Sequence, residues 1–185
     1  MGAAPKAATG LNEEWDSRVK HGNDSLSEGN RRKKEIMERK EKVILTNMCM
    51  IFDGTKLLVQ EKVGKGFKGI TCPGGHVDEN EPIVDSVIRE VKEETGLTIN
   101  DPKLCGIKDW FEEDGSRYMV FVFKATDFSG TLLSSEEGKV FWVEPFELKN
   151  YSTIWHFETM LKLVLDENYS ELFLDSNDNW KPVLK

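Results

Sequence analysis

Residues 75–97 read GHVDENEPIVDSVIREVKEETGL and carry most of the information about the fold. Apolar side chains recur there at spacings of three and four, which predicts a helix with a buried stripe made of Val84, Val87, Ile88 and Val91. Pro82 suits the first turn of this helix, and Gly96 suits a left-handed residue at its end. The segment therefore predicts one amphipathic helix directly after a glycine-rich loop.

The same helix places three carboxylates, Glu90, Glu93 and Glu94, on one face. Like charges at this spacing repel one another, so stability alone does not favour them. A solvated acidic surface is one interpretation. The glycine-rich loop just upstream and the buried stripe on another side of the helix favour a second, a site for Mg²⁺, which prefers oxygen ligands and often shares its shell with phosphates.

Charge is unevenly distributed along the 185 residues, which carry a formal net charge of -8. Residues 1–42 have a balance of +2, from 10 Lys/Arg and 8 Asp/Glu, and the remaining residues a balance of -10. We expect residues 1–42 to be a charged extension, partly disordered or helical, with Trp15 as its one anchor residue. Residues 43–166 then form the compact domain and 167–185 a tail. The acidic body argues against nucleic acid as a partner.

The cysteines Cys49, Cys72 and Cys105 form neither a metal-ligand pair nor a disulfide framework. Cys49 lies in an apolar run and is expected to be a small buried residue. The odd count fits a reducing compartment. The sequence shows no membrane-spanning stretch and no secretory signal pattern, so we expect a cytoplasmic protein without a membrane partner.

The remaining pattern predicts strands on both sides of the first helix. Asp53-Gly54 and Asp114-Gly115 read as hairpin turns. The predicted strands are 43–52, 56–62, 104–111, 117–126 and 139–143. A second amphipathic helix is expected over about 152–165, with Ile154, Phe157, Met160, Leu161 and Val164 on its apolar face. Strands mixed with two helices indicate an α/β or α+β fold with a mixed sheet.

The spacing of Gly75, Glu81, Arg89-Glu90-Val91, Glu93-Glu94 and Gly96-Leu97 resembles the Nudix box at every defining position. The wider resemblance, to MutT-like hydrolases, extends over about 43–164. It implies an α/β/α sandwich and hydrolysis of a nucleoside diphosphate linked to another group. It also implies that Mg²⁺ or Mn²⁺ is held by Glu90, Glu93, Glu94 and the carbonyl of Gly75, while Arg89 pairs with carboxylates such as Glu81.

The general base stays open among Glu90, Glu94 and a glutamate of a later loop. Glu136 and Glu137 precede the strand 139–143, in a position that resembles that loop in the family. An acidic turn is the competing interpretation. Of the two residues we prefer Glu137, as a base and as a further metal ligand.

Substrate contacts are predicted for residues that lie outside the box. Asn47 is a candidate for the edge of a purine, and Phe67, Trp110 and Trp155 are candidates for stacking on a base. Lys62, with Lys65 and Lys68 nearby, is a candidate for phosphate oxygens. Each residue has a structural alternative, as a strand-end polar group, a core aromatic residue or a solvated basic loop. Residues 150–155 read NYSTIW, where some purine-sanitising relatives carry an acidic pair.

The resemblance thus favours a Mg²⁺-dependent hydrolase of (deoxy)nucleoside triphosphates that releases a nucleoside monophosphate and pyrophosphate. Oxidised nucleotides such as 8-oxo-dGTP are candidate substrates. Two alternatives remain: a hydrolase of RNA 5′ pyrophosphate ends or other nucleoside diphosphate derivatives, and a non-catalytic nucleotide-sensing module. A homodimer also remains open.

Overall fold

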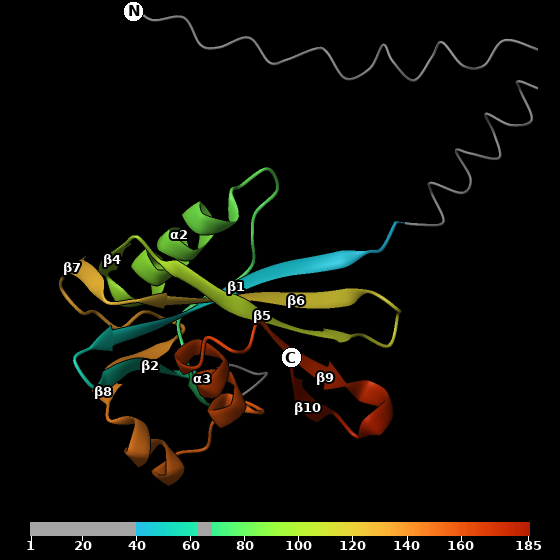
Figure 1. The fold of residues 1–185 in the computed structure, drawn as a ribbon. Coiled ribbons are helices and arrows are strands. Elements are labelled where there is room, and N and C mark those ends of the chain that lie inside the picture. The colour runs from blue at the N-terminus through green and yellow to red at the C-terminus, as the bar shows by residue number, and fades with distance from the viewer. Residues whose placement is uncertain (1–39, 63–67) are drawn as a thin grey trace, which may run out of the picture. The chain divides into compact units, whose positions relative to one another are not determined.

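The computed structural model describes residues 40–62 and 68–185 (Figure 1). The predictions for residues 1–39, including Trp15, and those for Lys65 and Phe67 lie outside these ranges. The helices are α2 (Ile83–Thr95), α3 (Phe157–Leu165) and the short 3-10 helices η1 (Pro145–Asn150) and η2 (Ser176–Asp178). The strands are β1 (Val43–Asp53), β2 (Lys56–Lys62), β3 (Gly69–Thr71), β4 (Leu97–Asn100), β5 (Lys103–Phe111), β6 (Arg117–Ala125), β7 (Asp127–Gly130), β8 (Gly138–Val143), β9 (Glu171–Asp175) and β10 (Lys181–Leu184).

The main sheet is mixed, in the order β10-β9-β5-β6-β1-β2-β3, with β8 on the other edge of β2. Its longest pairing is parallel and joins β1 to β6, from Val43 opposite Arg117 to Ile51 opposite Ala125. β4 and β7 form a separate antiparallel pair. The mixed sheet with helices confirms the predicted fold class.

Both predicted hairpins are present. β1 turns into β2 with Phe52 opposite Leu57, across Asp53-Gly54. β5 turns into β6 with Phe111 opposite Arg117, and Gly115 in that turn has a φ of +79°. A left-handed φ of this kind is sterically easy for glycine, which explains the Asp-Gly signal in the sequence.

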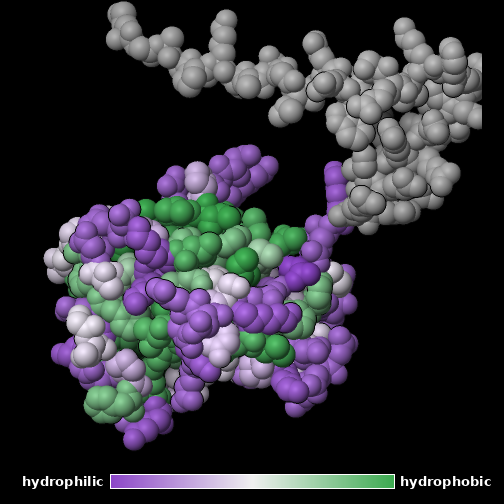
Figure 2. All heavy atoms as spheres, in the orientation of Figure 1, coloured by the Kyte–Doolittle hydropathy of each residue, from purple (hydrophilic) through white to green (hydrophobic). Residues whose placement is uncertain are grey.

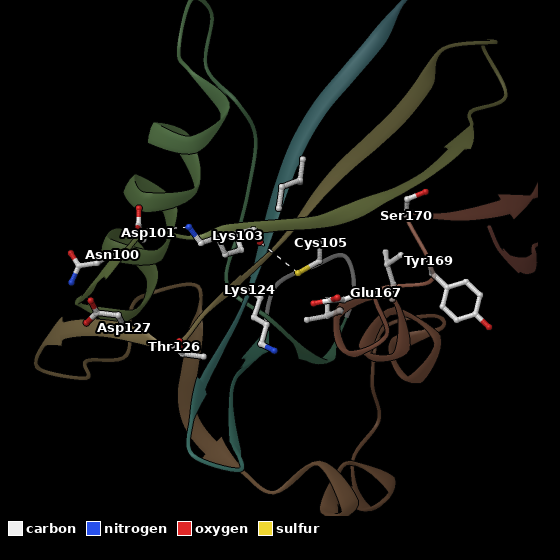
Figure 3. Close-up of a pocket in the computed structure, with 13 residues that line it drawn as sticks. Asn100, Asp101, Lys103, Cys105, Lys124, Thr126, Asp127, Glu167, Tyr169 and Ser170 are labelled. Atoms are coloured by element: carbon white, nitrogen blue, oxygen red, sulfur yellow. Dashed lines mark hydrogen bonds and ion pairs between the residues drawn. The ribbon is translucent and has the colours of Figure 1, made fainter.

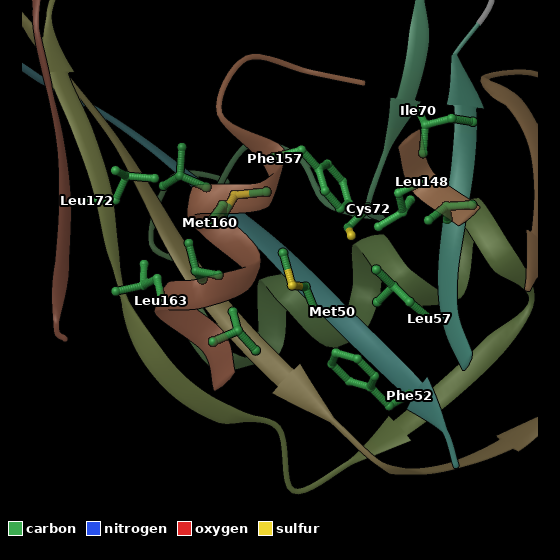
Figure 4. Close-up of a cluster of buried hydrophobic side chains, with 14 of the residues drawn as sticks. Met50, Phe52, Leu57, Ile70, Cys72, Leu148, Phe157, Met160, Leu163 and Leu172 are labelled. Carbon is green, nitrogen blue, oxygen red and sulfur yellow. The ribbon is translucent and has the colours of Figure 1, made fainter. Parts of the chain in front are cut away.

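Helices α2 and α3 lie on opposite sides of the sheet (Figure 1). Side chains alternate along a strand, so β1 contributes to both layers. Met50 packs with Phe157 and Met160 of α3 in one cluster (Figure 4), and Cys49 packs with Val87 and Val91 of α2 in the other. Cys49 is fully buried, as predicted.

One part of the predicted stripe on α2 is wrong. Val87 and Val91 are fully buried, but Val84 is 45% exposed. Ser86 and Glu94 are buried instead, which centres the inward face of the helix between Val87 and Glu94. Val84 therefore lies at the margin of this face. Gly96 ends the helix with a φ of +73°, as predicted.

The second helix begins later than predicted, at Phe157 rather than near Ser152. The preceding residues pair with the edge of the sheet, because the backbone of Ile70 bonds to the Ser152 carbonyl at 2.7 Å and to the Ile154 amide at 3.0 Å. His156 follows with a left-handed φ of +60°. Backbone pairing with β3 thus overrides the helical pattern of residues 152–156.

The C-terminal residues 167–185, expected as a tail outside the compact domain, form the hairpin β9–β10 of the main sheet. β9 lies parallel to β5, with Lys108 opposite Leu172. Leu172 and Leu174 are buried against the α3 layer. Charged and polar side chains cover much of the face in view in Figure 2, with hydrophobic residues visible between them. Among the described helices, none is long and apolar enough to span a bilayer.

Candidate active site

The glycine loop before α2 is fixed to β1 through its backbone. The amide of Asn47 donates to the Gly75 carbonyl at 2.8 Å, and the amide of Cys49 donates to the Pro73 carbonyl at 2.8 Å. A Cβ at Gly75 would lie 2.5 Å from the carboxyl carbon of Glu90, so any other residue here would displace that carboxylate from its present position. The loop and the first box carboxylate are therefore in direct contact.

Arg89 joins the loop to the helix. Its guanidinium binds Glu81 through two hydrogen bonds of 2.8 Å and donates to the His76 carbonyl at 3.1 Å. It also donates to Glu90 at 2.8 Å and to Glu93 at 3.3 Å. The hydrogen bonds from Arg89 lower the pKa of Glu81 to about 2, so this carboxylate stays charged. Arg89 thus holds several box carboxylates in one arrangement.

Glu94 is the most buried of the three predicted metal-binding glutamates, with 3% of its side chain exposed. It accepts hydrogen bonds from the Gly74 amide at 2.8 Å and from Lys62 at 3.3 Å. Burial raises the pKa of Glu94 to about 7, and the neighbouring carboxyl group of Glu137 acts in the same direction. The structure therefore joins Glu94 to the loop, to β2 and to the segment before β8.

Glu137 reaches this group across a long sequence distance. Its carboxylate binds Lys62 at 2.9 Å. The neighbouring carboxyl group of Glu94 and, after it, the hydrogen bond from Lys62 lower the pKa of Glu137. Glu136 forms no hydrogen bond or ion pair with the described residues. The structure thus brings Glu137, rather than Glu136, to the box.

The donor set suits a hard divalent cation. It consists of carboxylate oxygens and the Gly75 carbonyl, the ligand type that Mg²⁺ and Mn²⁺ prefer. The contact between Gly75 and Glu90 places two of these donor groups side by side. Within residues 40–62 and 68–185, however, no three acidic, histidine or cysteine side chains converge on one point. Arg89 and Lys62 engage the box carboxylates instead.

A cavity of about 520 Å³ begins at this loop. Gly74 and Gly75 line it, and their neighbours Glu94 and Glu90 are predicted metal ligands. Its other lining residues come from β1, β2, β3, β5, β6, the loop itself and the turn before α3: Thr46, Asn47, Met48, Lys62, Thr71, Cys72, His76, Lys108, Trp110, Tyr118, Val120, Ile154 and Trp155. One cavity therefore contacts both the box loop and the predicted base-binding residues.

Four predicted substrate residues line this cavity. Asn47 is buried and donates to Ser86 on α2 at 2.6 Å, so part of its amide joins β1 to the helix. Trp110 stacks on Tyr118 with ring centres 4.5 Å apart, which leaves only its other face for a ligand. Trp155 is 64% exposed at the cavity, and Lys62 faces Glu94. Contact of any of these residues with substrate stays a prediction.

Lys108 also lines the cavity and was not predicted. It lies on β5, two residues before Trp110, and is 7% exposed. The alternation of strand side chains places it on the same face as Trp110, which is the sequence signal that identifies it. Burial lowers the pKa of Lys108 to about 8.

A larger hollow of about 820 Å³ lies elsewhere in the fold (Figure 3). It is bordered by residues such as Lys103, Cys105, Lys124 and Tyr169. None of the predicted site residues lines it. Its position argues against a role in the chemistry of the box.

The NUDIX domain family matches residues 44–163. The chain belongs to the Nudix family. Enzymes of this family act on small nucleotides and generally use a divalent metal ion such as Mg²⁺. The match ends within α3, before the C-terminal hairpin β9–β10.

Several known proteins are similar to this Nudix chain. The uncharacterized Nudix hydrolase YvcI of Bacillus subtilis is 36% identical over 107 residues, which cover 55% of this chain and 66% of that protein. An ADP-ribose pyrophosphatase of Methanocaldococcus jannaschii is 32% identical over 51% of this chain and 56% of its own length. The chain thus spans less than two thirds of these relatives. A MutT protein of Bacillus halodurans has a similar structure, with a TM-score of 0.60, 27% identity, and coverage of 76% of this chain and 94% of its own.

Proposed function

We propose that this Nudix protein hydrolyses (deoxy)nucleoside triphosphates, including oxidised ones such as 8-oxo-dGTP, to a nucleoside monophosphate and pyrophosphate. The anhydride between the α- and β-phosphates is cleaved: the water oxygen bonds to one of these two phosphorus atoms, the bond from that phosphorus to the bridging oxygen breaks, and the water proton passes to a general base. The observation that carries the proposal is the single cavity lined by Gly74, Gly75, Lys62 and Trp110. It offers a phosphate end beside the box carboxylates and an aromatic end for a base.

Glu90, Glu93, Glu94 and the Gly75 carbonyl are the residues that would hold a divalent cation. When bound, such an ion neutralises phosphate charge and lowers the pKa of an attacking water. Arg89 and Lys62 contact these carboxylates in the present structure. These two basic side chains therefore keep the acidic side chains in place before a metal ion binds. This arrangement supports a positioning role for Arg89.

Glu137 is the residue we assign as the general base. It lies beside Lys62, which also lines the cavity, and it comes from a segment separate from α2. A carboxylate in this position can accept a proton from water as the oxygen attacks phosphorus. Lys62 is within reach of both Glu94 and Glu137, which makes its ammonium group a candidate partner for phosphate oxygens.

The similar proteins support cleavage of a phosphoric anhydride, although they differ in their names. The pyrophosphatase relative is named for ADP-ribose, and the structural relative is a MutT protein. A role in the cytoplasm, where hydrolysis removes damaged nucleotides from the pool before DNA synthesis, follows from the triphosphate proposal and depends on it.

The test measures product release with Mg²⁺ from a panel of normal and oxidised nucleoside triphosphates and from two other substrate classes. Pyrophosphate reports on the triphosphates and on 5′-triphosphorylated RNA, and AMP reports on ADP-ribose. We expect release from triphosphates, at a rate that falls when the ion is chelated. Turnover of ADP-ribose or RNA ends without turnover of free triphosphates would replace this assignment. No turnover of any compound would favour a sensing module.

A further inference from the structure

Lys108 is a buried cation that its partners among the described residues do not satisfy. Its ammonium donates to the backbone carbonyl of Trp155 at 3.3 Å. Among the described residues it forms no ion pair, since the salt bridges of this region involve other lysines and arginines. An ammonium group has three donors and no acceptor, and a buried charge without partners is costly. At least two of its N–H groups therefore remain for an acceptor in the cavity.

The sheet register places Lys108 well away from the box loop. Lys108 on β5 is opposite Val120 on β6, and Val120 is opposite Thr46 on β1. All three residues line the cavity, so they form a row across its sheet wall. The box loop bonds to β1, with Thr46 paired to His76. Two strand spacings separate the ends of this row, which is about 10 Å.

This separation assigns the two ends of the cavity to different parts of a nucleotide. Phosphates belong near Gly74 and Gly75, because the box carboxylates contact these residues. A sugar and a base then extend along the row toward β5. Trp110 and Tyr118 form an aromatic wall there, and the Lys108 ammonium lies 5.8 Å from the centre of the Trp110 ring. Lys108 thus lies at the base end of the cavity.

A lysine at the base end can donate hydrogen bonds but cannot accept them, so it suits some bases better than others. Guanine presents two neighbouring acceptors, O6 and N7, whereas adenine presents a donor amino group beside N7. A donor-only ammonium matches the first pattern and opposes part of the second. Oxidation of guanine at C8 leaves O6 as an acceptor and turns N7 into an N–H donor, so the contact that normal and oxidised guanine share is the one to O6.

We propose that Lys108 selects the base by donating to a ring carbonyl, so that the cavity takes 6-oxopurine nucleotides in preference to adenine nucleotides. This inference rests on the proposed function of the same site. Trp155 has a positioning role, because its carbonyl orients the ammonium toward the cavity wall. A preference for 6-oxopurine nucleotides would distinguish this chain from its ADP-ribose pyrophosphatase relative, whose named substrate carries adenine.

The experiment compares kcat/KM for GTP, ITP and ATP in the full chain and in Lys108→Met. ITP carries the 6-carbonyl without the 2-amino group, so it isolates the proposed contact. We expect the wild type to favour GTP and ITP over ATP by about tenfold to a hundredfold, from a contact worth 1–3 kcal/mol. In Lys108→Met this ratio should fall toward one, mainly through slower turnover of GTP and ITP.

Two further variants distinguish selection from general damage. Lys108→Gln keeps a donor and adds an acceptor, and the amide of glutamine suits adenine, so its ratio should shift toward ATP. Lys124→Met alters a partly buried lysine of β6 that borders the other hollow, and it should leave the ratio unchanged. Equal losses of kcat/KM for GTP, ITP and ATP in Lys108→Met would overturn the proposal. A wild type that does not favour GTP and ITP over ATP would also overturn it.

A binding measurement separates failure of this inference from failure of the proposed function. Calorimetric titration with GMP, IMP and AMP requires no turnover. We expect GMP and IMP to bind more tightly than AMP, and the difference to disappear in Lys108→Met. If no triphosphate is hydrolysed but this preference is present, the reaction assignment fails and the role of Lys108 stands. Equal or undetectable binding of the three monophosphates would overturn the role of Lys108.

Discussion

The two ends of the cavity are built in different ways. At the box end, Glu81, Arg89 and the three glutamates proposed as metal ligands come from one continuous segment, residues 75–97. At the base end, Lys108 of β5 meets the carbonyl of Trp155, 47 residues further along the chain. A sequence motif describes most of the first end, to which Lys62 and Glu137 are added from other segments. The second exists only after β1, β6 and β5 have aligned.

The two ends also differ in how their charges are satisfied. Arg89 binds Glu81 with two hydrogen bonds and also reaches Glu90 and Glu93, so the box end has internal partners for its charges. The ammonium of Lys108 has one carbonyl partner. The box end is therefore self-supporting before a ligand binds, whereas the base end is completed by one. Mutations at the two ends should separate turnover from selectivity.

The largest expected effect is at the box end, in Glu93→Gln. The side chain of Glu93 is 61% exposed, so the substitution should change the free energy of unfolding by less than about 0.5 kcal/mol. Loss of one carboxylate from the proposed cation site should lower kcat about a hundredfold or more for every substrate. The GTP to ATP ratio should not change. Pyrophosphate release and thermal unfolding measure both effects.

The matched control for this variant is Glu158→Gln, an exposed glutamate in the first turn of α3. It should retain full turnover. Nearly normal activity in Glu93→Gln would remove this residue from the cation site. A change in the GTP to ATP ratio would instead show that the two ends are coupled.

A smaller loss of turnover is expected from Gly75→Ala. The added Cβ would lie 2.5 Å from the carboxyl carbon of Glu90, so that carboxylate has to move. We expect a tenfold to hundredfold lower kcat, because a displacement of about an ångström at a catalytic site has effects of this size. Base selectivity should persist, since the base end does not contact Glu90.

Gly115→Ala should have the opposite effect, with lower stability and unchanged turnover. Gly115 has no neighbouring atom within 4 Å of an added Cβ, but its φ is +79°. Alanine at this φ should cost about 1 kcal/mol of stability without loss of turnover. If Gly75→Ala loses stability but keeps its kcat, the contact between Gly75 and Glu90 has no part in the reaction.

The sequence predicted the box end well because its signals are local. The spacing of three and four residues located α2, and Asp-Gly pairs located both hairpins. Val84 was wrongly predicted to be buried because two polar residues of the helix, Ser86 and Glu94, are buried instead. A pattern of hydrophobic residues cannot predict the burial of a carboxylate. The late start of α3 has another cause, since backbone pairing of residues 152–154 with Ile70 depends on a strand distant in sequence.

The base end was predicted only in part. Trp110 and Trp155 were named as aromatic candidates, but Lys108 was not, although it has the same strand parity as Trp110. A lysine in a strand is usually exposed, and its burial here results from α3 and β9 covering β5. The C-terminal strands carry a weak pattern, so the sequence alone did not reveal this cover.

The smallest expected effect is a change in the free energy of unfolding, not in activity, and it concerns Lys108→Met. Burial lowers the pKa of Lys108 from 10.5 to about 8, so the protonated group destabilises the folded chain. This penalty is fully present below about pH 8, where both states are protonated, and it disappears as the pH approaches 10.5. Lys108→Met should therefore increase the free energy of unfolding at pH 7 by on the order of 1–3 kcal/mol.

Urea unfolding at pH 7 and pH 10 measures the gain, which should be much smaller at the higher pH. The exposed Lys103→Met, on the same strand, should change stability by less than about 0.5 kcal/mol at both values. A destabilised Lys108→Met at pH 7 would mean that the folded protein already satisfies this charge, and that the base end does not depend on a ligand to do so.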